Sequence, residues 1–185
     1  MIREINNVDD FIIKSKRIIK EKLFSDPDII EALNNPNLNP DEPDSYLDVN
    51  IFDYIRVPGT TSETKNFICF DIRQQSLNAV NNHMKDVLYI FGVYVHESNM
   101  RTPYGMSRHD LLGYLIRDIF NYSNIFGTQL VEISDVPGIM DEYSSSRTIT
   151  FRAVQSASLN EGVRTNKYEF GEINNRSWCG STLFW

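Results

Sequence analysis

The stretch VLYIFGVYVH at residues 87–96 constrains the fold of this chain more than any other segment. Its β-branched and aromatic residues favour a strand, and its nearly continuous apolar character is typical of a strand covered on both faces. Gly92 within it indicates either a bulge or close packing against a neighbour. We therefore expect a central strand, and the remaining elements must supply its neighbours.

Four further segments have strand character. Residues 51–57 end at the turn signal Pro58-Gly59, and residues 66–73 alternate between two faces, so we expect these two segments to pair as a hairpin. Residues 128–134 and 147–154 also alternate. They are separated by residues 135–146, a loop that is long for a hairpin and is therefore expected to carry contacts.

Apolar residues at three- and four-residue spacing predict the helices. One stripe runs through residues 8–23, with Asn7 placed to cap it, and another runs through residues 111–120, with Ser107 as its cap. Ser25-Asp26-Pro27 indicates a restart into a short second helix. The order predicts an α+β fold, a mainly antiparallel sheet of about five strands packed by two helices.

The acidity of the chain is concentrated in one segment. The net charge is −7 over 185 residues, but residues 25–53 hold eight acidic residues and no basic one. Residues 34–50 are rich in proline and asparagine and predict an extended linker, tied down at most by Leu38, Tyr46 and Leu47. We expect one domain over residues 1–155, which contains this linker, and an extended C-terminal arm over residues 156–185.

The sequence contains no catalytic or cofactor-binding pattern that we recognise. The glycine-rich phosphate-binding patterns, H-E-x-x-H and G-x-S-x-G are missing, and the acids lack the spacing of a calcium-binding EF-hand. Cys69, in mid-strand, is typical of a small core residue. We expect no cofactor, no metal and no enzymatic activity. The alternative is a small hydrolase in which His96, Glu97 and Asp71 converge.

Three features point to contacts with other chains. The acidic linker suits a basic partner, the loop 135–146 is long, and the arm ends in large aromatic residues. Those aromatic residues either pack on their own domain or dock on a neighbouring subunit, and both alternatives stay open. The candidate interface residues are Asp41, Glu42, Asp44, Asp48, Pro137, Ile139, Met140, Tyr143, Trp178, Phe184 and Trp185.

The order and texture of the elements resemble a family of phage proteins. The stretches that carry the resemblance are VLYIFGVYVHES at 87–98, SRHDLLGYLIRDIFNYS at 107–123, and TQLVEIS and SRTITFRAV within 128–154. They are similar to the tail terminator, or tail completion, proteins of long-tailed bacteriophages and to related neck proteins. The linker 34–50 and the aromatic arm are additions to that pattern.

The resemblance implies a structural virion protein, made in the host cytoplasm. Such a protein forms a homo-oligomeric ring, usually a hexamer, which ends the tail tube and joins it to the connector, while DNA passes through the lumen without specific binding. The chain has no apolar run of transmembrane length, so we expect no membrane partner. The alternatives are another neck or head-closure ring, a small soluble enzyme, or an acidic adaptor that binds a basic partner through residues 25–53.

Overall fold

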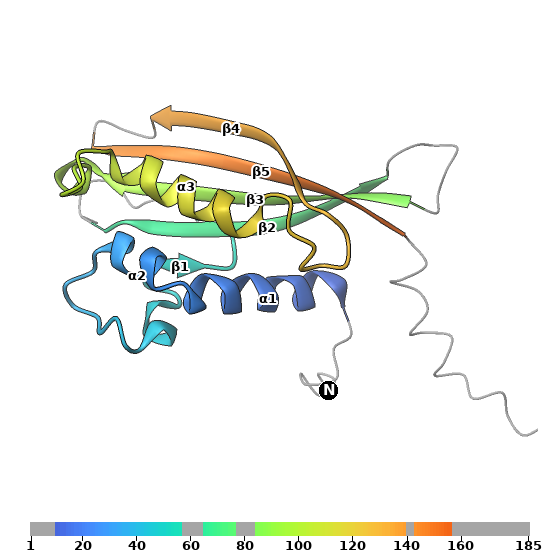
Figure 1. Cartoon of the computed structure of the whole chain (residues 1–185), viewed down its shortest axis with the longest axis horizontal. Helices are drawn as coiled ribbons and strands as arrows, with labels where there is room; N and C mark the ends of the chain where they lie inside the picture. Colours follow the sequence, from blue (N-terminus) through green and yellow to red (C-terminus); the bar gives the residue numbers. More distant parts are fainter. Residues whose placement is uncertain (1–9, 57–64, 77–83, 140–142, 157–185) are drawn as a thin grey trace, which may run out of the picture.

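Five strands form a single mixed sheet in the order β1-β2-β3-β5-β4 (Figure 1). The structure is a computed structural model, and it describes residues 10–56, 65–76, 84–139 and 143–156. The described elements confirm the predicted α+β class. In chain order they are α1 (Phe11–Ser25), α2 (Pro27–Leu33), the 3₁₀ helix η2 (Pro43–Tyr46), β1 (Ile51–Phe52), β2 (Phe67–Ser76), β3 (Met84–His96), the 3₁₀ helix η3 (Glu97–Asn99), α3 (Arg108–Phe120), β4 (Val131–Ile139) and β5 (Ser144–Ser156).

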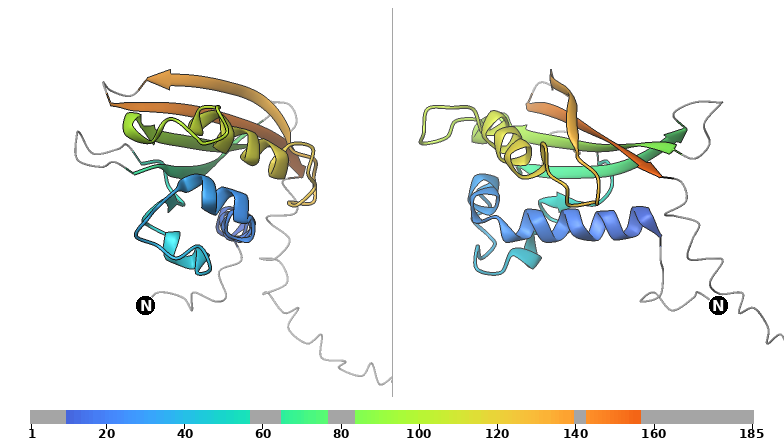
Figure 2. Two further views of the ribbon diagram at one scale, coloured as in Figure 1. Left: turned by 60° about the vertical axis from the view of Figure 1, so that its left-hand side comes forward. Right: turned by 45° about the vertical axis from the view of Figure 1, so that its right-hand side comes forward.

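The predicted central strand is the middle strand of the sheet. β3 pairs antiparallel with β2 on one side and with β5 on the other. One row of its side chains is fully buried in the main core, to which all three α-helices contribute. The helices therefore cover the same face of the sheet (Figures 1 and 2). The buried row consists of Val87, Tyr89, Phe91, Val93 and Val95.

A second, smaller apolar cluster lies on the opposite face of the sheet. It contains Phe52, Phe67, Cys69 and Tyr94, and the rings of Phe67 and Tyr94 stack with centroids 4.8 Å apart. A Cβ at Gly92 would lie 2.9 Å from Tyr94 Cε2 and 3.0 Å from Cys69 Sγ. The glycine thus serves close packing, and the unbroken register with β2 shows no bulge there. Cys69 is a buried core residue, as the sequence predicts, and burial raises the pKa of its thiol.

Aspartate side chains cap the first two helices and set the residue at which each begins. The Asp10 side chain accepts hydrogen bonds from the backbone N–H groups of Ile12 and Ile13, so α1 begins there and the predicted cap at Asn7 is wrong. Asp26 caps α2 in the same way, and Pro27 occupies the first helical position. The predicted restart between the two helices is confirmed.

The predicted hairpin between residues 51–57 and 66–73 is wrong. β1 is only two residues long and pairs parallel to β2, with Ile51 opposite Ile68 and Phe52 opposite Cys69. Ile51 packs in the main core, and Phe52 packs in the smaller cluster on the opposite face of the sheet. Tyr54 and Ile55, which have equal strand propensity, are exposed instead.

The predicted long loop over residues 135–146 is also wrong. β4 continues to Ile139 and β5 starts at Ser144, with Ile139 opposite Ser145. Pro137 is tolerated because β4 is the edge strand, where only alternate N–H groups face a neighbouring strand. The serines at the start of β5 are held by pairing with residues 94–96 of β3 rather than by their own propensity.

The acidic linker is anchored to the core at the points that the sequence indicates. Tyr46 is buried and Leu38 packs against the main core, while Asp41, Glu42, Asp44 and Asp48 stay exposed. A chain of three asparagines, of which Asn50 and Asn66 are buried, joins the two ends of the linker to the domain. Asn35 Nδ2 donates to Asn50 Oδ1 at 2.6 Å, Asn50 Nδ2 donates to the Asn66 carbonyl at 2.6 Å, and Asn66 Nδ2 donates to the Leu33 carbonyl at 3.0 Å.

Replacing Asn50 tests the contribution of this chain of asparagines. Asn50→Ala removes two hydrogen bonds and leaves buried polar partners unsatisfied, so the free energy of unfolding should fall by about 2 kcal/mol. Urea unfolding monitored by circular dichroism measures the change. Asn37→Ala, at an exposed position in the same segment, is the control and should stay within about 0.5 kcal/mol of the parent. Equal effects of the two substitutions would contradict the role of Asn50.

Candidate functional site

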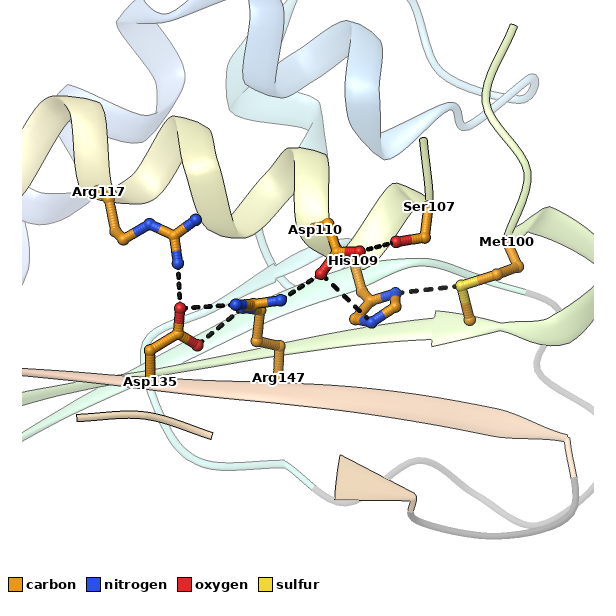
Figure 3. Close-up of polar contacts among 7 residues, drawn as sticks. All are labelled: Met100, Ser107, His109, Asp110, Arg117, Asp135 and Arg147. Atoms are coloured by element: carbon orange, nitrogen blue, oxygen red, sulfur yellow. Dashed lines mark hydrogen bonds and ion pairs between the residues drawn. The ribbon is translucent and has the colours of Figure 1, made fainter. Parts of the chain in front are cut away.

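Helix α3 presents a polar side to the β4–β5 edge of the sheet. Its apolar stripe, which includes Leu112, Ile116 and Phe120, faces the main core. The helical spacing of this stripe leaves Asp110 and Arg117 on the flank beside the strands, where they meet Asp135 of β4 and Arg147 of β5 (Figure 3). We call Asp110, Arg117, Asp135 and Arg147 the α3 ion network.

Arg147 is the centre of the α3 ion network. Its Nε and Nη2 donate to the two carboxylate oxygens of Asp135, each at 2.7 Å, and its Nη1 donates to Asp110 (Figure 3). Arg117 donates to Asp135 from the opposite side. Hydrogen bonding to the Asp135 carboxylate raises the pKa of the Arg147 guanidinium. Two cations and two anions compensate each other, with the guanidinium and Asp135 largely buried.

A glycine on α3 makes room for this arginine. A Cβ at Gly113 would lie 2.8 Å from Arg147 Cδ and 3.2 Å from its Nε. Any larger residue at this position would push the side chain away from Asp135. Glycine weakens a helix because its backbone is flexible. The presence of glycine at position 113 is explained by the close approach of Arg147 from β5.

Asp110 links the network to the start of α3. The Ser107 hydroxyl donates to its carboxylate, and this hydrogen bond, together with His109 and Arg147, lowers the pKa of Asp110 below 3.8. His109 Nε2 lies 3.6 Å from Asp110 Oδ1, and its Nδ1 lies 3.2 Å from Met100 Sδ (Figure 3). Both carboxylates of the network have a cationic partner, so the arrangement is that of a clamp between helix and sheet.

The residues of the hydrolase alternative do not converge. Asp71 lies opposite Ile90, six positions before His96 on β3, which corresponds to about 20 Å along the strand. Asp71 instead forms an ion pair with Lys16 of α1 at 2.7 Å. His96 Nδ1 lies 2.8 Å from the Ser98 hydroxyl at the end of β3. That particular hydrolase site is excluded by the geometry.

The candidate interface residues fall into three groups. The four linker acids, Asp41, Glu42, Asp44 and Asp48, are exposed together on one segment. Pro137 and Ile139 lie on the edge strand β4 instead of a loop, and Tyr143, also exposed, stacks on His96 with ring centroids 6.4 Å apart. Met140, Trp178, Phe184 and Trp185 lie outside the described residues.

β4 exposes apolar side chains along its length. Val131 pairs with Arg152 and Val136 pairs with Thr148, on the face opposite the helices, while Asp135 points to α3. Ile133 occupies a bulge, and Ile139 at the end of the strand is 86% exposed. An edge strand with such side chains is a surface on which another chain can pack.

A groove of about 720 Å³ lies beside the start of α3. It lies between α2, the loop at residues 100–107 and the first turns of α3, at the end of the sheet where β3 finishes (Figure 1). Ala32 and Leu115 contribute a buried apolar floor, and Tyr104, Met106 and Tyr114 stand exposed along its walls. No sequence motif marks this groove, because its residues come from three separate segments.

The groove carries both signs of charge. Arg108 is only 7% exposed, and its guanidinium donates to the carbonyl oxygens of Ala32 at 2.6 Å and Asn99 at 2.7 Å. Burial lowers the pKa of Arg108, and within the described residues neither Arg108 nor the exposed Arg101 forms an ion pair. Asp28 and Glu31 line the α2 wall.

The described residues thus define a small α+β domain with helices on one face and an open sheet edge. Within them, no three histidine, cysteine or acidic side chains gather as a metal site, and no helix has the length and apolar character needed to cross a bilayer. A family model named YomW matches residues 26–153, more than half of the chain, so the protein belongs to the YomW family. No curated protein matches the chain significantly.

The family match defines which part of the fold is shared. It begins at the cap of α2 and ends within β5, so it includes α2, α3 and the groove, whereas α1 lies before it. YomW is a phage-derived gene name, and the resemblance to phage proteins is confirmed at the level of a phage-associated family.

Replacing Asp135 tests the clamp between α3 and the sheet. Asp135→Asn leaves the largely buried Arg147 guanidinium without its bidentate carboxylate, so the free energy of unfolding should fall by about 2 kcal/mol. A double-mutant cycle with Arg147→Gln, measured by urea unfolding, isolates the pair. Strictly additive effects of the two substitutions would show that the pair contributes nothing.

Acid unfolding tests the role of Asp110. Because its pKa is lower in the folded protein, its carboxylate contributes full stabilisation above the ordinary value of 3.8 and loses it as the pH falls through the folded value. Asp110→Asn should therefore weaken the dependence of the unfolding free energy on pH below about pH 4. Asp118→Asn, exposed on the same helix, is the control. Parallel pH profiles for the parent and Asp110→Asn would contradict this assignment.

Proposed function

We propose that this protein is a structural component of the phage virion at the head–tail junction. In this proposal, copies of the chain form a ring, with six as the expected number, that ends the tail tube and joins it to the connector. Membership of a phage-associated family supports the general setting. The resemblance of residues 87–154 to tail terminator proteins supports the specific place, and a head-closure ring is the nearest alternative.

The observation that carries the proposal is the exposed apolar edge strand. Val131, Ile133, Val136 and Ile139 are exposed apolar side chains on β4, beside an open strand edge. A subunit in a closed ring needs such a surface, because each copy contacts the next through two different patches. Pro137 and the bulge at Ile133 interrupt regular pairing along this edge, which disfavours unlimited strand addition.

The exposed acids fit passage of DNA. Asp41, Glu42, Asp44 and Asp48 have no basic residue within residues 25–53 and are exposed on the described structure. If they face the lumen of the ring, they repel the phosphate backbone and let DNA pass without binding. The same acids would serve the adaptor alternative, in which they bind a basic protein partner.

Oligomeric state tests this proposal directly. The purified full-length chain, or the chain in assembled particles, should form rings visible by negative-stain electron microscopy and countable by native mass spectrometry. Ile133→Lys with Val136→Lys should shift the population to monomers, because two charges must be desolvated at the contact. Ile13→Lys, an exposed isoleucine on α1, is the matched control. A parent chain that is strictly monomeric in both settings would overturn the ring.

A further inference from the structure

The groove beside α3 has the properties of a peptide-binding site. Its floor is apolar, and Tyr104, Met106 and Tyr114 are all more than 40% exposed along its walls. Aromatic and methionine side chains are enriched where proteins bind other chains, because they provide large contact areas. An extended peptide with bulky apolar side chains would cover these exposed groups.

Arg108 indicates that the occupant also carries a negative charge. Its guanidinium is held under the groove by the Ala32 and Asn99 carbonyls, so its position is set before any ligand arrives. Carbonyl oxygens satisfy its hydrogen bonds but do not neutralise its charge. Arg101 adds a second cation at the rim, and the acids Asp28 and Glu31 stand on the α2 wall. The groove therefore suits a segment with an acid and a base a short distance apart.

The C-terminal arm contains one segment of this description. Residues 167–170 read Lys-Tyr-Glu-Phe, so charged and aromatic residues alternate. This short stretch thus offers one base, one acid and two aromatic rings. We propose that residues 167–170 of a neighbouring copy bind in this groove, with Glu169 towards Arg101 and Arg108, Lys167 towards the acids of α2, and the aromatic rings on the apolar surface.

Chain length favours a neighbouring copy over the same copy. The arm leaves the sheet at Ser156, which pairs with Met84, whereas the groove lies beyond His96 at the other end of β3 (Figures 1 and 2). That is about 40 Å along the strand. Lys167 lies eleven positions after Ser156, and a fully extended chain spans at most about 40 Å over that length. The arm would reach the groove of its own copy only when fully extended, which favours the groove of an adjacent copy as its binding site.

This inference rests on the proposed ring and adds a contact to it. An arm that crosses to the next subunit supplements the β4 contact and ties each copy to its neighbour through a separate surface. Two linked weak contacts hold far better than either alone, because the second forms at high local concentration.

Cross-linking between copies that carry different cysteines tests the contact. Full-length Tyr104→Cys and full-length Tyr168→Cys, each with Cys179→Ser, are mixed and oxidised; the buried Cys69 stays unreactive. We expect a disulfide-linked heterodimer in denaturing gels. Tyr122→Cys, equally exposed at the far end of α3, replaces Tyr104→Cys as the control and should give at least fivefold less product. Equal yields from both positions would overturn the proposal, as would a disulfide within one chain when both cysteines are placed on it.

An exchange of charges between the groove and the arm tests the predicted orientation of the bound segment. Arg101→Glu and Glu169→Arg should each lower the cross-linking yield by roughly fivefold, and the combined variant should recover most of it. Arg73→Glu, exposed on β2, is the matched control for the groove, and Glu161→Arg is the control for the arm. Absence of recovery in the combined variant would overturn the orientation.

Rings that form without the cross-link would overturn the groove contact alone, whereas cross-linked chains that never close into rings would overturn only the ring.

Discussion

The packing of three phenylalanine rings holds the elements of this fold together. Phe91 of β3 contacts Phe120 of α3 with ring centroids 4.8 Å apart and Phe151 of β5 at 5.7 Å, and Phe120 and Phe151 are 6.2 Å apart. All three are fully buried. The contact joins the central strand, its neighbour and the covering helix, and such rings bury large apolar areas. The positions of the α3 ion network and of the groove both follow from where this packing sets α3.

Among the described residues, helices cover one face of the sheet and not the other. The main core takes apolar residues from all three α-helices, while the described part of the opposite face has the small cluster around Cys69 and Tyr94. The uncovered face continues to β4, whose apolar residues remain exposed. This asymmetry makes the sheet edge and the open face the natural surfaces for assembly, while the α3 ion network locks the same edge strand to the domain.

Much of the fold was predictable from local pattern. The apolar run at 87–96 identified the central strand, the stripe at 111–120 identified α3, and Asp26-Pro27 identified the break between α1 and α2. These signals are strong because burial on one side of a regular element imposes its period on the sequence. The pairing of β1 and the length of β4 were not predictable, because both are decided by neighbours in the sheet rather than by propensity.

The candidate sites show the same division. The sequence by itself determined the α+β class, the central strand, the anchoring of the acidic segment by Tyr46 and the buried state of Cys69, since each depends on composition and spacing within a short stretch. Only the tertiary structure decided that Asp135 and Arg147 meet beside Gly113, that β4 is an exposed edge, and that α2, α3 and the loop 100–107 enclose a groove with a buried arginine. The physical reason is that these features are contacts between segments far apart in the chain, and no local pattern records which segments the core brings together.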